Sequence, residues 1–184
     1  VFMFELGTRV TYSASCGETA TAYLWRVDSK PNQPPKVQAR PLVEMTAPTI
    51  QQFKDQMAYL SGYADLRQDR GAEILAQLGT PVPFQASIAF IDPARTPYTI
   101  ELLNTALRFA NYNHMRIKYT IAAKRPIEIS PQVQPMIATP THGSLPSGHA
   151  TEAFIAARML WKLLRASGTP QYQQDGVWGE MFMR

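Results

Sequence analysis

The segment TPYTIELLNTALRFANYNHMRIKYTI, residues 96–121, carries a long helical periodicity that organises the rest of the chain. Thr96 can cap a helix here, and Pro97 suits its first turn because that position needs no amide hydrogen. Apolar residues then recur at spacings of three and four, which places them on one helix face. The members of this stripe are Leu103, Leu107, Ala110, His114, Ile117 and Ile121. We therefore expect a long helix whose striped face lies in the core, with His114 partly buried on it.

Further helices are predicted on both sides of this segment. The first has Pro48 in its first turn, and the second covers about residues 65–78 and stops at Gly79. A last helix opens at Ser147 and ends near Gly168. Its predicted buried face consists of Ala150, Phe154, Ala157, Trp161 and Leu164.

Residues 1–47 differ from the rest of the chain, because they are rich in Thr, Val and Tyr and end in a proline-rich stretch. They predict a short β hairpin or an extended arm. The predicted organisation is an N-terminal arm, residues 1–47, followed by a helical domain, residues 48–184. The fold class expected from these patterns is mainly α, a helical bundle with an irregular or short β N-terminal arm.

The composition and charge of the chain limit its expected binding partners and its expected cellular location. The chain has 184 residues and a net charge of +4, but its basic residues are scattered, so we expect no nucleic-acid partner. No apolar run is long enough to span a bilayer, and the first residues do not form a signal peptide. The chain starts at Val1, so a signal peptide that was removed earlier would favour a periplasmic or secreted location.

Two cations stand near the end of the long predicted helix. Lys118 and Arg125 are seven residues apart, about two helical turns, so they are expected on one face. Pro126 disfavours helical geometry at Arg125 and should hold its guanidinium at the helix exit. There it can bind a tetrahedral oxyanion with two parallel hydrogen bonds, while Lys118 supplies a point charge. The alternative is that both cations only complement the helix dipole.

The last predicted helix begins with an unusual cluster, Ser147-Gly148-His149, directly after Pro146. The first amides of a helix lack intrahelical partners and favour an anion. The Ser147 hydroxyl can donate to the same anion, Gly148 permits close approach of its backbone, and His149 can exchange a proton. Each residue also has a structural interpretation, as a cap, a turn residue and a satisfied histidine.

Taken together, K-x6-R-P at Lys118 and Arg125-Pro126, then nineteen residues, then P-S-G-H at Pro146–His149, resembles a known signature. It is similar to that of the phosphatidic acid phosphatase type 2 and vanadium-dependent haloperoxidase superfamily. The resemblance implies the helical bundle of that superfamily and a site for phosphate or vanadate. The oxyanion-binding residues would be Lys118, Arg125, Ser147 and Gly148.

The resemblance leaves two reactions open. In a haloperoxidase these residues would hold vanadate as cofactor, with Lys118 and His149 catalytic, and hydrogen peroxide would oxidise a halide. In an acid phosphatase no cofactor is needed, and His149 would protonate the leaving group of a phosphate monoester. His142 favours the first, because bromoperoxidases of the superfamily carry His and chloroperoxidases carry Phe five residues before this serine. His142 is therefore a third candidate catalytic residue.

The third motif of the superfamily, S-R-x5-H-x3-D, does not occur in residues 1–184. Its histidine is the phosphatase nucleophile or the vanadium ligand, so we expect that group beyond Arg184 and no metal ligand within these residues. A complementing C-terminal chain or a homo-oligomer is the expected protein partner. A third hypothesis is a non-catalytic anion-binding protein that lacks the motif altogether.

Overall fold

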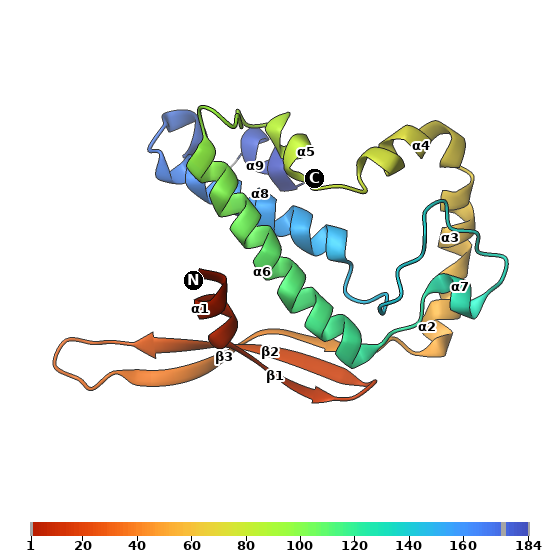
Figure 1. Ribbon diagram of the computed structural model, residues 1–184, viewed down its shortest axis with the longest axis horizontal. Helices are drawn as coiled ribbons and strands as arrows, with labels where there is room; N and C mark the ends of the chain where they lie inside the picture. Colours follow the sequence, from red (N-terminus) through yellow and green to blue (C-terminus); the bar gives the residue numbers. More distant parts are fainter. Residues whose placement is uncertain (1, 174–175, 184) are drawn as a thin grey trace. The chain divides into compact units, whose positions relative to one another are not determined.

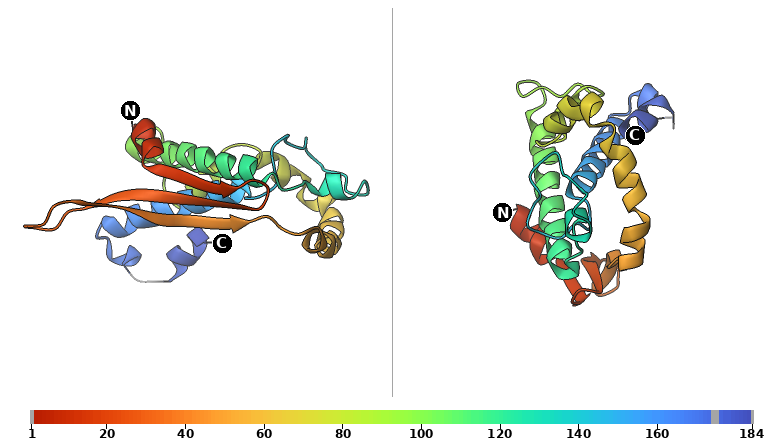
Figure 2. Two further views of the ribbon diagram at one scale, coloured as in Figure 1. Left: turned by 90° about the horizontal axis from the view of Figure 1, so that it is seen from below. Right: turned by 90° about the vertical axis from the view of Figure 1, so that its right-hand side faces the viewer.

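The computed structural model describes residues 2–173 and 176–183. Helices make up 52% and strands 15% of the chain, and three of the strands form one antiparallel sheet (Figures 1 and 2). The N-terminal elements are α1 (Phe2–Thr8), β1 (Val10–Ser15), β2 (Thr19–Asp28), β3 (Lys36–Thr46), α2 (Ile50–Asp55), α3 (Met57–Ala64) and α4 (Arg67–Ala76). The remaining elements are α5 (Val82–Ala86), α6 (Pro97–Ile121), α7 (Pro126–Ile129), α8 (Gly148–Ala166), the 3-10 helix η1 (Pro170–Tyr172) and α9 (Val177–Met183).

The predicted fold class is wrong, because the chain is mixed α/β and does not form a clear helical bundle. The difference comes from the N-terminal residues, for which the sequence predicts a short β hairpin or an extended arm and which form a helix and a three-stranded sheet in the order β1-β2-β3. Gly17 makes the first turn possible with φ of 78°, a left-handed conformation that glycine adopts without strain. The proline-rich stretch connects β2 to β3, so it is a hairpin loop and not an extended arm.

The chain divides into two compact units. Unit 1 contains residues 1–76 and 115–146, and unit 2 contains residues 77–114 and 147–184. Helix α6 contributes its C-terminal residues to unit 1 and its N-terminal residues to unit 2. The division into residues 1–47 and 48–184 stays a prediction.

The core of unit 1 joins the sheet to the C-terminal part of α6. Ile117 and Ile121 are buried against Ala20 of β2, with Tyr12 and Met45 of the neighbouring strands packed around them. The amide of Gly17 also donates to the Thr120 carbonyl over 3.0 Å, which ties the β1–β2 turn to the helix. This packing fixes the end of α6, where the cationic part of the candidate site begins.

The core of unit 2 lies between the N-terminal part of α6 and the helices α5, α8 and α9. Leu103 of α6 is fully buried against Ala156, Ala157 and Leu160 of α8, and Phe182 of α9 closes the cluster. Hydrophobic burial of this kind is the main force that holds short helices such as α5 in place.

The predicted long helix is confirmed as α6, which begins at Pro97. Its stripe is buried as expected at Leu103, Ala110, Ile117 and Ile121, and Leu107 is half-buried. The Thr96 hydroxyl accepts from the Asp92 amide over 2.9 Å, so its side chain stabilises the preceding loop.

Two other helix predictions need correction. The first predicted helix starts after Pro48, at Ile50 with Thr49 as its cap, and is interrupted at Gln56 between α2 and α3. In α8 the buried face is rotated from the predicted one, since Phe154 is 51% exposed while Ala156 and Leu160 are buried. This helix is apolar on more than one face, so tertiary packing and not periodicity selects the buried one.

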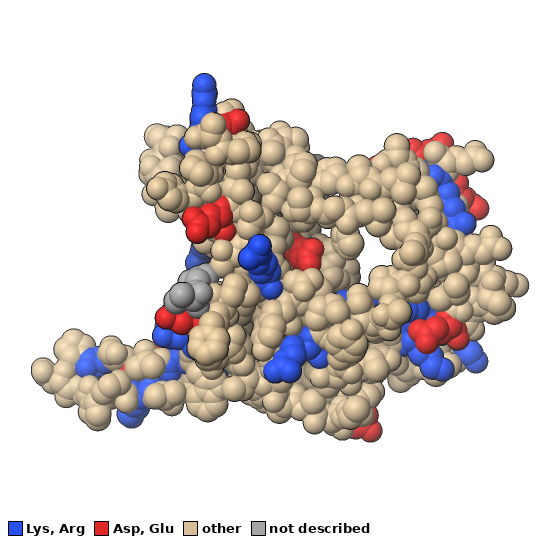
Figure 3. All heavy atoms as spheres, viewed as in Figure 1, with Lys and Arg blue, Asp and Glu red and all other residues tan. Residues whose placement is uncertain are grey.

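No helix in the described part of the chain is long and apolar enough to cross a membrane. Figure 3 shows Lys and Arg side chains dispersed over the visible face among acidic and uncharged residues.

Candidate functional site

Lys118 is a buried cation of α6 that follows Ile117 of the core stripe, with only 2% of its surface exposed. Its Nζ donates to two backbone carbonyl oxygens, that of Gly143 at 3.0 Å and that of Ser144 at 3.3 Å. Burial lowers the pKa of Lys118 below its usual 10.5, and the nearby positive charge of Arg125 lowers this pKa further. The ammonium therefore sits where a positive charge is costly and has no ionic partner on α6.

Arg125 donates to the Gly143 carbonyl as Lys118 does, but it does not lie on the helix face that the spacing predicts. Helix α6 ends at Ile121, and Ala122 adopts φ of 49°, so the two cations do not share a helix face. Pro126 is the first residue of α7 and Arg125 is extended before it, as expected for a residue that precedes proline. The guanidinium donates to the His142 carbonyl at 3.0 Å and to the Gly143 carbonyl at 3.3 Å.

His142 is held by Arg125. Its Nδ1 lies 3.0 Å from Nη2 of Arg125, which can only donate, and 3.1 Å from the Gly143 carbonyl oxygen, which can only accept. The structure thus brings together Lys118, Arg125 and His142 of the predicted site residues within unit 1.

The loop residues 142–144 are fixed to the end of α6 by hydrogen bonds and by close packing. The Ser144 amide donates to the Ala123 carbonyl at 2.9 Å, and its hydroxyl donates to the Lys124 carbonyl at 2.8 Å. A Cβ on Gly143 would lie 2.7 Å from the Lys118 carbonyl oxygen, so only glycine lets the loop approach this closely. Gly143 and Ser144 are site residues that sequence reasoning missed, although both stand within the segment between His142 and Ser147.

The Glu128 carboxylate lies close to one of these cations, because it accepts a hydrogen bond from the Arg125 backbone amide at 2.5 Å. No carboxylate within residues 2–173 and 176–183 forms an ion pair with Lys118 or Arg125. Arg125 also lines a cavity of about 700 Å³ in unit 1, together with Lys54 and Arg67, and none of the described residues that line this cavity is acidic. The arrangement favours binding of an anion.

Ser147, Gly148 and His149 lie at the start of α8, in unit 2. Ser147 is the cap, and its hydroxyl oxygen accepts from the Ala150 amide at 3.2 Å, which leaves the hydroxyl proton for a further acceptor. A Cβ on Gly148 would lie 3.2 Å from Cε1 of His114, so the absence of a side chain makes room for that imidazole. This contact accounts for the glycine without the close approach to an oxyanion that the sequence suggested.

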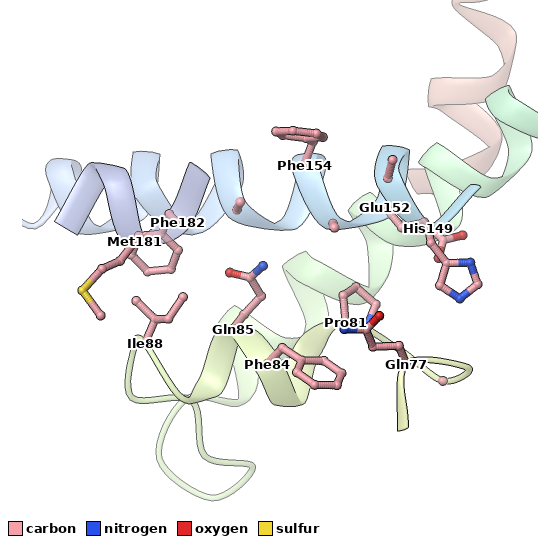
Figure 4. A pocket seen from close by; sticks show the side chains of 14 residues that line it. Gln77, Pro81, Phe84, Gln85, Ile88, His149, Glu152, Phe154, Met181 and Phe182 are labelled. Atoms are coloured by element: carbon pink, nitrogen blue, oxygen red, sulfur yellow. The ribbon is translucent and has the colours of Figure 1, made fainter. Parts of the chain in front are cut away.

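His114 is more buried than predicted, with 4% of its surface exposed, and it pairs with α8. Its Nε2 lies 3.2 Å from Oε1 of Glu152, which also lies 3.5 Å from the Asn111 amide nitrogen. Glu152 was missed in the sequence because a lone carboxylate in a helical segment usually faces solvent. His149 is exposed and lines a second cavity, shown in Figure 4.

Comparison with family models, with curated proteins and with solved structures finds no match to this chain.

Proposed function

We propose that Lys118 and Arg125 bind a tetrahedral oxyanion, phosphate or vanadate, beside the loop of residues 142–144. One observation carries the proposal: two cations converge on a single carbonyl oxygen, that of Gly143, and neither has a carboxylate partner in the described chain. Two like charges this close repel each other, and a carbonyl dipole offsets only part of that repulsion. An oxyanion bound beside the two cations would offset this repulsion and accept two parallel hydrogen bonds from the guanidinium.

The resemblance of P-S-G-H to the superfamily signature is the basis for the roles proposed for Ser147, Gly148 and His149. In the superfamily pattern the Ser147 hydroxyl and the Gly148 amide would bind an oxyanion, and His149 would transfer a proton. The order of the two motifs along the chain supports this assignment. The exposure of His149 is compatible with proton exchange with a small substrate.

For the reaction, we propose haloperoxidase-like chemistry with vanadate as cofactor, and hydrolysis of phosphate monoesters as the alternative. The cationic pair fits vanadate as well as phosphate, because both are tetrahedral anions of similar size. Bound vanadate would activate hydrogen peroxide for oxidation of a halide. The position of His142 against Arg125 supports the haloperoxidase, since it places an imidazole, a group that can transfer protons, beside one of the two cations.

The binding proposal is tested by titration calorimetry with phosphate and by vanadium NMR with orthovanadate. Replacing Lys118 by Met or Arg125 by Gln should weaken binding of either anion by about tenfold or more, because a hydrogen bond to a charged group contributes about 1.5–3 kcal/mol. Lys124→Met is the matched control, since Lys124 is an exposed lysine one residue before Arg125. Equal affinities in all variants would refute the proposal.

The reaction is tested by comparing bromide oxidation, in the presence of peroxide and vanadate, with hydrolysis of a phosphate monoester. Bromide oxidation that requires vanadate supports the haloperoxidase, whereas hydrolysis that vanadate inhibits supports the phosphatase. His149→Ala should abolish either activity without unfolding α8, so full turnover in that variant rejects its role in proton transfer. Anion binding without either activity supports the non-catalytic hypothesis.

A further inference from the structure

Unit 2 contains a cavity of about 420 Å³ between α5, α8 and α9, a size typical of small-molecule sites (Figure 4). Most residues that line it are apolar, and Phe84, Ile88 and Phe182 offer large side chains for contact with a hydrophobic molecule. Neither Lys118 nor Arg125 lines this cavity, although His149 does, so an inference from it is independent of the cationic pair.

One buried polar group points to a specific ligand chemistry. Gln85 is only 9% exposed and lines the cavity, and Figure 4 shows its carboxamide directed from α5 towards α8. Its Oε1 is buried without a hydrogen-bond partner among the described residues. A buried acceptor without a donor is unfavourable, so a ligand that brings an O–H or N–H group to this oxygen would gain the missing hydrogen bond.

The charged residues that line the cavity indicate which net charge the ligand carries. Among the described residues that line the cavity there is no Lys or Arg, whereas Glu152 and His149 are present. An anionic ligand would lose its hydration against a largely apolar wall and would meet the Glu152 carboxylate, and among the described lining residues only the exposed His149 could offer it a positive charge. A neutral ligand with one donor avoids both costs.

We propose that this cavity binds a neutral phenol-like molecule, an aromatic ring with a short apolar substituent and one hydroxyl group. The hydroxyl donates to Oε1 of Gln85, and the ring and its substituent contact Phe84, Ile88 and Phe182. Aromatic side chains suit a ring because offset and edge-to-face arrangements add to simple hydrophobic burial.

The test compares three ligands of nearly the same shape with the unaltered chain, by NMR titration of the methionine methyl groups. We expect para-ethylphenol to bind saturably and about tenfold more tightly than para-ethylanisole, whose oxygen has no proton to donate. We expect para-ethylbenzoate to bind at least tenfold more weakly than the phenol. Equal affinity for phenol and anisole, tighter binding of the benzoate, or no saturable binding of the phenol would overturn the proposal.

A substitution then assigns the effect to one side chain. Gln85→Leu keeps the size of the side chain and removes the acceptor, so the tenfold preference for phenol over anisole should disappear. Gln171→Leu is the control, since Gln171 is an exposed glutamine of unit 2 outside the cavity. A preference that persists in folded Gln85→Leu would contradict the assignment. If that variant does not fold, the ligand comparison with the unaltered chain still decides the proposal.

Discussion

Replacing Gly143 by Ala should strongly destabilise unit 1, because its missing side chain permits the closest backbone contact of the site. An added Cβ would lie 2.7 Å from the Lys118 carbonyl oxygen, 3.1 Å from the Ala123 nitrogen and 3.2 Å from the Ala122 Cα. All three are backbone atoms, so no side chain can rotate away to relieve the overlap. The loop itself would have to move.

The expected loss follows from two effects. Overpacking that shifts the backbone costs about 1–3 kcal/mol. Movement of the loop would also weaken hydrogen bonds made by the Ser144 amide and the Gly143 carbonyl, each contributing about 1 kcal/mol. We expect a decrease of about 2–4 kcal/mol in the free energy of unfolding, and a fall in Tm on the order of 10 °C for a chain of this length.

The assay is urea unfolding followed by circular dichroism, with Gly62→Ala as the matched control. Gly62 lies in α3, also in unit 1, and an added Cβ there meets nothing within 4 Å. The control should therefore gain about 0.5–1 kcal/mol, because alanine favours the helix. The reasoning is refuted if Gly143→Ala is as stable as the unaltered chain or if both substitutions change stability in the same direction.

Three further predictions concern the ends of α6 and α8. Ala122→Gly should raise the free energy of unfolding by about 0.5–1 kcal/mol in denaturant titration, because a non-glycine residue is strained at φ of 49°. The free energy of unfolding of the unaltered chain should rise with pH between the lowered pKa of Lys118 in the folded state and 10.5. In that range Lys118 is protonated in the unfolded chain and not in the folded one, so the unfolded chain binds more protons. Lys118→Met should lack this rise when unfolding is measured across the same pH range. Ser147→Ala should lower the free energy of unfolding in urea by about 1 kcal/mol, because the helix cap is lost. Ser147→Asp should keep most of the original stability, because aspartate can also cap the helix.

Several helices could be predicted from the sequence because their signals are local. The stripe from Leu103 to Ile121 and the proline at position 97 describe α6 whatever surrounds it. The fold class could not be predicted in the same way, because strand pairing depends on contacts between residues distant in sequence. The proline-rich stretch resembles a linker until the register of β2 with β3 shows that it closes a hairpin.

The candidate site could also be predicted only in part from the sequence. Lys118, Arg125 and His142 stand out by residue type and spacing, but the reason that they lie together is Gly143, whose carbonyl both cations share. A glycine between two motifs carries no local signal for such a contact. Likewise, Gly148 has the spacing of an oxyanion-binding residue, yet its missing side chain accommodates the His114 ring.

By itself, the sequence determined the long helix α6, where α6 and α8 begin, and which side chains can carry charge or a proton. These properties depend on hydrogen bonding and periodicity within a few residues of chain. Only the tertiary structure decided which face of α8 is buried, that the N-terminal residues pair as a sheet, and that Lys118 is enclosed without a carboxylate partner among the described residues. Those outcomes depend on packing between distant segments, where the burial of one side chain depends on which surface covers it.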